Sequence, residues 1–264
     1  MIKKFTLLLL CLNALALLAF YFLDHEALNQ PLSDKTVPVE LHDGAVSIQL
    51  RHRPFTVFEF PAKVSPPVGV ILLASGDGGW GAWEETVSQS LQANGFTVVG
   101  INSNDYAKTD YDLATLQADW NTIAQSVRDQ FPNSPPRVIV SGWSMGAAQA
   151  IAVAGGPDRP KGLVGVLVAS LFSRGRYGLR ISDEADILPT GPGTFAMTDF
   201  ASGMNGLRIV QWHAVGDRDD STAWLSKLKT IHREIDFKNA GHDFNGASPE
   251  FMQKFAESAL WILK

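Results

Sequence analysis

Six short apolar runs recur between residues 68 and 237, and helical patterns separate several of them. Some runs are apolar at nearly every position, which is typical of strands buried on both faces of a parallel sheet. Ahead of them, apolar and polar residues alternate on both sides of Arg53-Pro54, which indicates an antiparallel hairpin. The pattern predicts an α/β fold with a mostly parallel sheet and helices on both faces. The expected strands are residues 68–75, 96–102, 136–143, 162–170, 207–214 and 231–237, and the expected helices are residues 83–94, 111–130, 144–154 and 249–263.

The composition suits a single domain with a large buried core. The chain has 264 residues, of which 45% are hydrophobic and 19% are charged. We place this domain at residues 41–264. The net charge of -5 argues against a nucleic-acid-binding surface. The one cysteine, Cys11, excludes a disulfide within the chain.

The first residues have the pattern of an export signal. Lys3 and Lys4 precede an apolar stretch at residues 5–23, which is close to the roughly 20 residues that cross a bilayer. We interpret residues 1–23 as a signal anchor or a signal peptide, and favour an uncleaved anchor because bulky aromatic residues occupy the cleavage region. Residues 24–40 would be a linker. The domain would then lie in the periplasm, tethered to the inner membrane, or be released there if the signal is cleaved.

A G-x-S-x-G motif, formed by residues 142–146, stands between an expected strand and an expected helix. In this context the motif indicates a strained turn that lifts a serine hydroxyl clear of the sheet. Gly142 and Gly146 would let the strand and the helix pass close together. The helix N-terminus would favour negative charge that develops beside the serine. Ser144 is therefore the predicted nucleophile.

A serine nucleophile needs a base, and three histidines follow Ser144 in the chain. His213 and His232 fall in expected strands, so we interpret them as structural. His242 lies in the loop between the last expected strand and the last expected helix. A base in that loop can reach the serine turn, and His242 is the predicted base.

The acid of the triad is expected in the loop after the preceding strand, which contains Asp217, Asp219 and Asp220. We choose Asp219 because Gly216-x-x-Asp219 has the spacing of a turn that presents a carboxylate to a histidine. Asp220 could instead cap a helix, and Asp217 could be a solvated surface charge. The sequence does not separate the three firmly. The acid would fix the imidazole tautomer and stabilise the imidazolium.

The stretch SGDGGWGAW, residues 75–83, contains G-x-G-x-x-G directly after an expected strand. A dinucleotide site would also need an acidic residue about 20 positions further on, at the end of the second strand. That strand ends at Asn102 instead. We therefore interpret the loop as part of an oxyanion hole, in which the backbone N–H of Met145 and that of Asp77 or Gly78 hold the tetrahedral intermediate.

Together these motifs resemble the bacterial virulence protein VirJ and the related C-terminal domain of AcvB. The resemblance spans about residues 65–264, and its most specific parts are residues 75–80 and 241–246. It implies an exported protein with the α/β-hydrolase fold. Members of this family are linked to hydrolysis of aminoacylated phosphatidylglycerol, chiefly the lysyl ester, so the resemblance implies an ester of a membrane lipid as substrate.

For such a substrate the chain offers several binding candidates. Tryptophans would form an apolar rim, acidic residues would attract a lysyl ammonium group, and arginines of the long connection at residues 171–206 would meet a lipid phosphate. The candidates are Trp80, Trp83 and Trp143 for the rim, Asp77 and Asp105 for the ammonium, and Arg174, Arg176 and Arg180 for the phosphate.

Two other functions also fit the sequence: a general periplasmic esterase or lipase, and a non-catalytic secretion or virulence partner on a hydrolase fold. The glycine-rich connection at residues 171–206 is interpreted either as a lid or binding loop, or as a surface excursion only. No set of histidines and acids has metal-ligand spacing along the chain, so we expect neither a metal nor a cofactor. The sequence does not indicate the oligomeric state.

Overall fold

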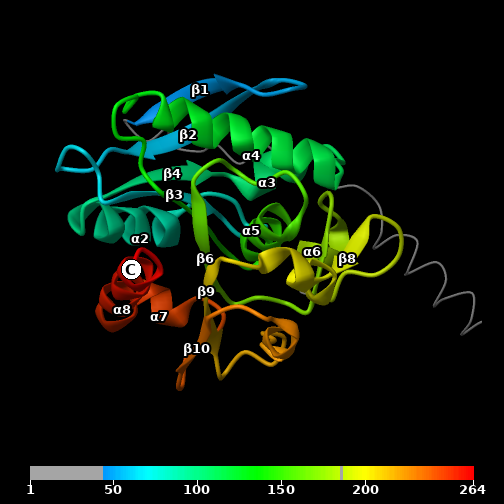
Figure 1. Ribbon diagram of the computed structural model, residues 1–264. Helices are drawn as coiled ribbons and strands as arrows, with labels where there is room; N and C mark the ends of the chain where they lie inside the picture. Colours follow the sequence, from blue (N-terminus) through cyan, green and yellow to red (C-terminus); the bar gives the residue numbers. More distant parts are fainter. Residues whose placement is uncertain (1–43, 185–186) are drawn as a thin grey trace, which may run out of the picture.

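The structure, a computed structural model, describes residues 44–184 and 187–264. Its centre is an eight-stranded sheet with the order β1-β2-β4-β3-β5-β6-β9-β10 (Figure 1). β2 pairs antiparallel with both β1 and β4, and the other pairs in this sheet are parallel. The predicted hairpin and the predicted mostly parallel sheet are confirmed. The strands are β1 (Ala45–Gln49), β2 (Pro54–Phe60), β3 (Gly69–Ala74), β4 (Phe96–Ile101), β5 (Val138–Trp143), β6 (Leu163–Ala169), β9 (Arg208–Ala214) and β10 (His232–Phe237).

The central strands explain the continuous apolar runs. β3 and β4 are buried at all six of their positions, because helices cover the sheet on both sides. In a parallel sheet the carboxyl ends of the strands meet at one edge, and the loops that follow them gather there. The loops after β3, β5, β9 and β10, together with the first residue of α5, carry all the residues predicted to act in the chemical step.

Helices cover both faces of the sheet (Figure 1). α4 (Leu113–Arg128) and α5 (Met145–Gly155) share one hydrophobic core with the sheet, whereas α2 (Ala82–Ala93) and α8 (Pro249–Ile262) pack in a second core on the opposite face. The four predicted helices begin and end within two residues of these bounds. The shorter helices are α3 (Ser103–Ala107), α7 (Phe244–Ala247) and the 3₁₀ helix η2 (Ala223–Lys227).

The connection after β6 is a packed subdomain. It contains β7 (Arg174–Arg176), α6 (Ile181–Glu184), β8 (Thr194–Ala196) and the 3₁₀ helix η1 (Met197–Met204), and β7 pairs antiparallel with β8. Phe195, Phe200 and Met204 are buried in the same core as α5. Of the two interpretations, a loose surface excursion is therefore wrong, because this segment contributes to the core.

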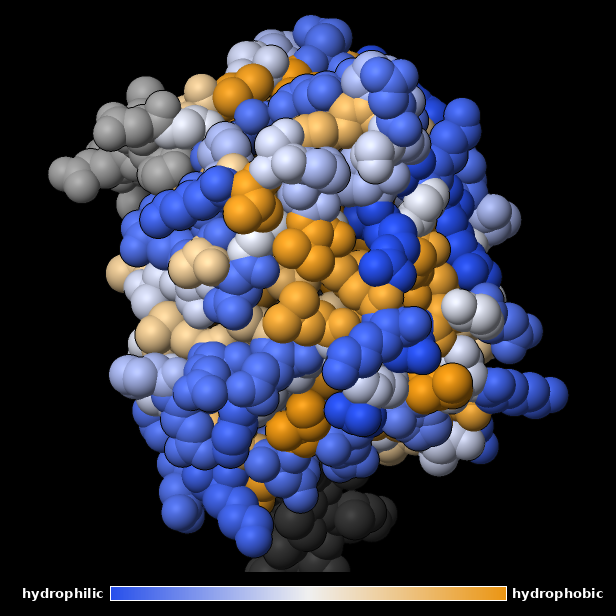
Figure 2. All heavy atoms as spheres, turned by 60° about the vertical axis from the view of Figure 1, so that its left-hand side comes forward, coloured by the Kyte–Doolittle hydropathy of each residue, from blue (hydrophilic) through white to orange (hydrophobic). Residues whose placement is uncertain are grey.

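Most large apolar side chains are buried, but some remain on the surface. Figure 2 shows one face on which apolar residues gather near the middle while hydrophilic residues surround them. The most exposed large apolar side chains of the described residues include Val64, Val215 and Ile231, with 51%, 49% and 61% of their surface accessible. Apolar surface of this kind is a normal minority feature of a folded domain.

The predicted membrane segment at residues 1–23 and the predicted linker at residues 24–40 lie outside the described residues. Across residues 44–184 and 187–264, we find no helix with the length and apolar character needed to cross a bilayer.

Candidate active site

Ser144 occupies a strained turn between β5 and α5. Its backbone has φ 54° and ψ -118°, a conformation that non-glycine residues rarely adopt. The residue lies at the N-cap of α5, directly after the last residue of β5. This is the local geometry that exposes the hydroxyl of a nucleophilic serine above a sheet.

The glycines around Ser144 are required by close backbone contacts. A Cβ on Gly142 would lie 2.2 Å from the carbonyl carbon of Gly146, and a Cβ on Gly146 would lie 2.4 Å from the carbonyl oxygen of Ala74. Both distances are too short for real atoms. The first glycine therefore lets the helix start against the strand, and the second lets the helix pass the end of β3.

The predicted base has an acid partner, but not the predicted one. Nδ1 of His242 lies 2.6 Å from Oδ2 of Asp217, whose side chain is only 10% exposed. Asp219 is 40% exposed, and its carboxylate contacts Arg218 instead. The choice of Asp219 is thus corrected to Asp217.

Turn geometry explains this correction. The backbone N–H of Asp219 donates to the Asp217 carboxylate, while the N–H of Gly216 donates to the carbonyl of Ala240 at 2.9 Å. The second bond holds the start of this loop against the loop that carries His242. The first carboxylate after Gly216 therefore meets the imidazole, and the third residue after Gly216 points away.

Asp220 has a structural position. It is buried, and its carboxylate accepts hydrogen bonds from the backbone N–H groups of Leu171 and Ala214 and from the side chain of Gln211. Burial raises the pKa of Asp220 to about 6. This residue fastens the end of β9 to the start of the segment after β6, rather than capping a helix.

His242 is held beside the serine turn by its neighbours. Its carbonyl accepts hydrogen bonds from the Trp143 indole and from the Ser170 hydroxyl, each at 2.8 Å. Its ring lies 5.1 Å from the ring of Trp143, the residue immediately before Ser144, and 5.8 Å from the ring of Phe172. Trp143 thus positions the predicted base, a role that the sequence did not indicate.

A narrow cavity of about 40 Å³ opens beside Ser144. One wall comes from Asp77, Ser144 and Met145, so both the loop after β3 and the start of α5 reach it. Gly78, the alternative to Asp77 in the predicted oxyanion hole, is not one of the described residues that line this cavity. The opposite wall comes from the subdomain after β6. Its lining residues are Phe172, Arg174, Gly175, Arg176, Asp183, Ile187 and Pro189.

Two of the lining residues form a buried ion pair. Nε of Arg176 lies 3.8 Å from Oδ1 of Asp183, and both side chains are less than 10% exposed. Burial raises the pKa of the Asp183 carboxyl and lowers the pKa of the Arg176 guanidinium. Asp183 was missed at the sequence level, where the weak periodicity of this segment gave no sign of which residues face inward.

Trp80, a predicted substrate-binding residue, lies away from the cavity. It stacks on Phe58 with 4.9 Å between ring centroids, and its indole donates to Glu85. A Cβ on Gly100 would lie 2.1 Å from the Trp80 ring, so the ring fills the space above that glycine. Trp80 therefore packs against β2 and β4 and does not form a rim.

Asp105 and Arg180 are also corrected, because neither lines the cavity. Asp105 pairs with Arg53 at 3.2 Å. Arg180 forms a two-pronged bond with Asp110, with both distances 2.7 Å. That partner lowers the pKa of the Asp110 carboxyl. These charges are matched outside the cavity that Ser144 lines.

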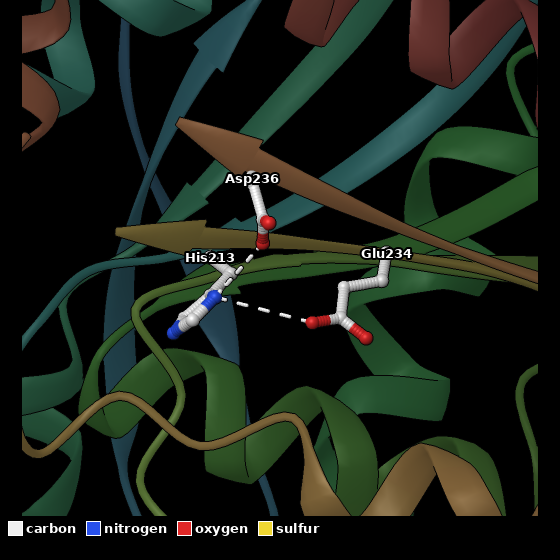
Figure 3. Close-up of side chains that lie close together, drawn as sticks. All are labelled: His213, Glu234 and Asp236. Atoms are coloured by element: carbon white, nitrogen blue, oxygen red, sulfur yellow. Dashed lines mark hydrogen bonds and ion pairs between the residues drawn. The ribbon is translucent and has the colours of Figure 1, made fainter. Parts of the chain in front are cut away.

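One group of described residues could hold a metal ion, although the sequence indicated none. It consists of His213, Glu234 and Asp236 (Figure 3). Their separation along the chain hid the group, because pairing of β9 with β10 brings them together. His232, the other histidine interpreted as structural, is exposed at the start of β10.

The strand order, the serine turn and the histidine–aspartate pair together define the α/β-hydrolase fold. Solved structures agree, each covering 81–83% of this chain. The esterase domain of a Rhodothermus marinus protein is 14% identical, with 97% of its own length covered and a TM-score of 0.61. A thermostable carboxyl esterase from Bacillus coagulans is 13% identical, with 98% covered and a TM-score of 0.63. A dienelactone hydrolase from Anabaena variabilis is 16% identical, with 93% covered and a TM-score of 0.60.

Within that fold, residues 69–172 match the family described as bacterial virulence protein (VirJ). The match covers β3 to the end of β6, including the glycine loop and the Ser144 turn. The resemblance to VirJ is thus confirmed over these residues. No curated protein is significantly similar in sequence to the chain.

Proposed function

We propose that this protein is a serine esterase in which Ser144, His242 and Asp217 form the catalytic triad. The observation that carries the proposal is the strained Ser144 backbone at the strand-to-helix turn, flanked by a cavity. The 2.6 Å bond between Asp217 and His242 supports it, because a carboxylate on Nδ1 leaves the other ring nitrogen to act as base. The hydrolase fold of the solved esterases is consistent with this chemistry.

The proposed reaction is acyl transfer in two steps. The Ser144 hydroxyl attacks the ester carbonyl, while Nε2 of His242 accepts the hydroxyl proton and passes it to the leaving alcohol oxygen. Water then attacks the acyl-enzyme with the same base. The backbone N–H groups of Met145 and Asp77 would stabilise the oxyanion, since both residues line the cavity beside Ser144.

A lipid ester with an anionic group, such as lysyl-phosphatidylglycerol, is the proposed substrate. The VirJ match supports this choice, and so does Arg174 on the cavity wall. Its guanidinium donates to the carbonyl of Pro189 and to the hydroxyl of Thr194, which are both neutral. Within the described part of the chain, no carboxylate lies at ion-pair distance from Arg174, so its charge is available to a phosphate. Asp77 and Asp183 would lie near the lysyl group of this lipid substrate.

We also propose that the domain is exported and acts at the inner membrane, as the lysines and apolar stretch at residues 1–23 indicate. Protease added to spheroplasts should then digest the domain without lysis. Protection until the cells are lysed would place the domain in the cytoplasm and contradict this part of the proposal.

Labelling with a fluorophosphonate probe tests the enzyme class. The wild-type protein should label, and Ser144→Ala should not, with an unchanged circular dichroism spectrum. If the wild type fails to label under conditions in which other serine hydrolases do, the protein is a non-catalytic member of the fold.

A substrate panel tests the finer proposal. Purified protein should release lysine from lysyl-phosphatidylglycerol faster than it hydrolyses neutral aryl or triacylglycerol esters. Rapid turnover of many simple esters with none of the lysyl lipid would identify a general esterase instead.

A further inference from the structure

We propose that His213, Glu234 and Asp236 form a site for one divalent transition-metal ion of the zinc class. His213 lies on β9, and the two acids lie on β10, the neighbouring parallel strand. His213 and Asp236 are partners in the register of the two strands. Glu234 stands two residues before Asp236 and therefore projects from the same face of the sheet. Figure 3 shows both carboxylates directed toward the same nitrogen of the His213 ring.

The distances are already close to those of a metal centre. Nδ1 of His213 lies 3.0 Å from Oδ1 of Asp236 and 3.9 Å from Oε1 of Glu234. The three ligand atoms all lie within 4.8 Å of one another. Zinc binds such nitrogen and oxygen atoms at about 2.0–2.2 Å, which places neighbouring ligand atoms about 3–3.5 Å apart. The Glu234 carboxylate, which is the more distant of the two from Nδ1, would have to move closer to reach this arrangement.

The charges at this position favour a cation. A proton on Nδ1 of His213 can point to only one carboxylate, yet two approach that nitrogen. A divalent ion between the three atoms would neutralise both acids. One imidazole with two carboxylates suits zinc or its neighbours better than magnesium or calcium, which prefer oxygen ligands alone. Glu234 and Asp236 are 43% and 53% exposed, so water can complete the coordination.

The position of the site suggests what the ion would do. β9 ends one residue after His213, and β10 ends one residue after Asp236. The loops that follow carry Asp217 and His242, which form the proposed acid–base pair. β10 is the last strand of the sheet and pairs only with β9 among the described strands. A bound ion would therefore fasten the edge strand at the end that supports the base, without taking part in the reaction.

Zinc binding to the metal-free full-length protein tests the site. Calorimetric titration with zinc chloride should detect one equivalent, and zinc at about 100 times its dissociation constant should raise the melting temperature by about 5–10 °C. His213→Asn and Asp236→Asn should each lose the equivalent and the rise. His232→Asn is the matched control, because His232 lies on the same strand but its Nδ1 contacts the carbonyl of Thr230 at 3.0 Å and is not part of the cluster. It should keep both signals.

Binding at the catalytic pair is the main competing outcome. His242→Asn should keep the zinc equivalent, because His242 is not a ligand in the proposed site. Loss of the equivalent in His242→Asn, together with its retention in His213→Asn, would overturn the proposal. So would the absence of any zinc-dependent rise in the wild type at millimolar zinc. These outcomes are read from the calorimetric titration and from the melting temperature, so the test does not depend on esterase activity.

Discussion

The two walls of the cavity beside Ser144 are built differently. On one side the serine turn, α5 and the glycine loop approach backbone to backbone, so that even one added carbon on Gly146 would meet Ala74. On the other side, the subdomain after β6 presents charged side chains, among them Arg174 and Asp183. Backbone contacts fix atoms more closely than flexible side chains do. The first wall is therefore suited to holding the reacting groups in place, and the second wall is suited to selecting the substrate.

The acid–base pair next to the first wall gives the largest expected effect. Asp217→Asn should lower kcat about 10⁴-fold, because an amide leaves the His242 imidazole in the wrong tautomer. Steady-state kinetics on an ester that the wild type cleaves would measure this loss.

Asp219→Asn is the matched control, since Asp219 lies two residues away on the same loop and its carboxylate pairs with Arg218 instead of His242. Its kcat should stay within about threefold of the wild type. Equal losses in the two variants would mean that the loop, rather than the bond to His242, is what the reaction requires.

Backbone packing at the first wall predicts the next largest effect. Gly146→Ala should lower the free energy of unfolding by about 3 kcal/mol or more, because its Cβ would lie 2.4 Å from the Ala74 oxygen and 2.5 Å from the Ser75 oxygen. Urea denaturation would measure the loss.

Gly78→Ala provides the comparison. Apart from its two neighbours in the chain, no described residue has an atom within 4 Å of a Cβ at Gly78, so this change should cost less than about 1 kcal/mol. If both alanine variants are equally stable, the first wall is softer than the contacts imply.

A buried carboxyl group supports the glycine loop on the backbone-built side. Glu84 is buried at the start of α2 and accepts a hydrogen bond from the N–H of Gly81 in the glycine loop. Burial raises the pKa of Glu84 from 4.5 to about 7. Because the folded pKa is the higher one, Glu84 favours folding most at low pH, and this contribution is lost as pH rises from about 4.5 to about 7.

Glu84→Gln removes this titration while keeping an acceptor for Gly81. The stability of the variant relative to the wild type should therefore rise between pH 4.5 and pH 8 by up to about 3 kcal/mol, as judged from the shift in pKa. Urea denaturation at several pH values would check this. A difference that does not change with pH would show that the buried carboxyl does not titrate in this range.

The sequence predicted best those features that depend on neighbouring residues in the chain. The strands and helices follow from apolar periodicity, and the Ser144 turn and the loop of His242 follow from short motifs beside them. Asp217 was not separable from Asp219, because the direction of each carboxylate depends on a turn held by a bond from Gly216 to the distant Ala240.

The sequence also could not predict contacts between segments that are distant in the chain. The sequence predicted Trp80 as a rim residue, but its ring packs over Gly100 of β4. The cluster around His213 has no ligand spacing along the chain, because its acids come from the next strand. In both cases the partner is set by strand pairing, which the local pattern does not contain.

The second wall predicts the smallest but most selective effect. Arg174→Met should lower kcat/KM for a phosphate-bearing lipid ester about 10–100-fold, as expected for loss of a charge-assisted hydrogen bond, and should leave a neutral aryl ester within about twofold. Arg180→Met is the control, since Arg180 is already matched by Asp110 and should affect both esters alike and weakly. If Arg174→Met lowers kcat/KM equally for the two esters, this arginine supports the cavity wall through Pro189 and Thr194 and does not bind the substrate phosphate. The two walls would then differ in construction but not in role.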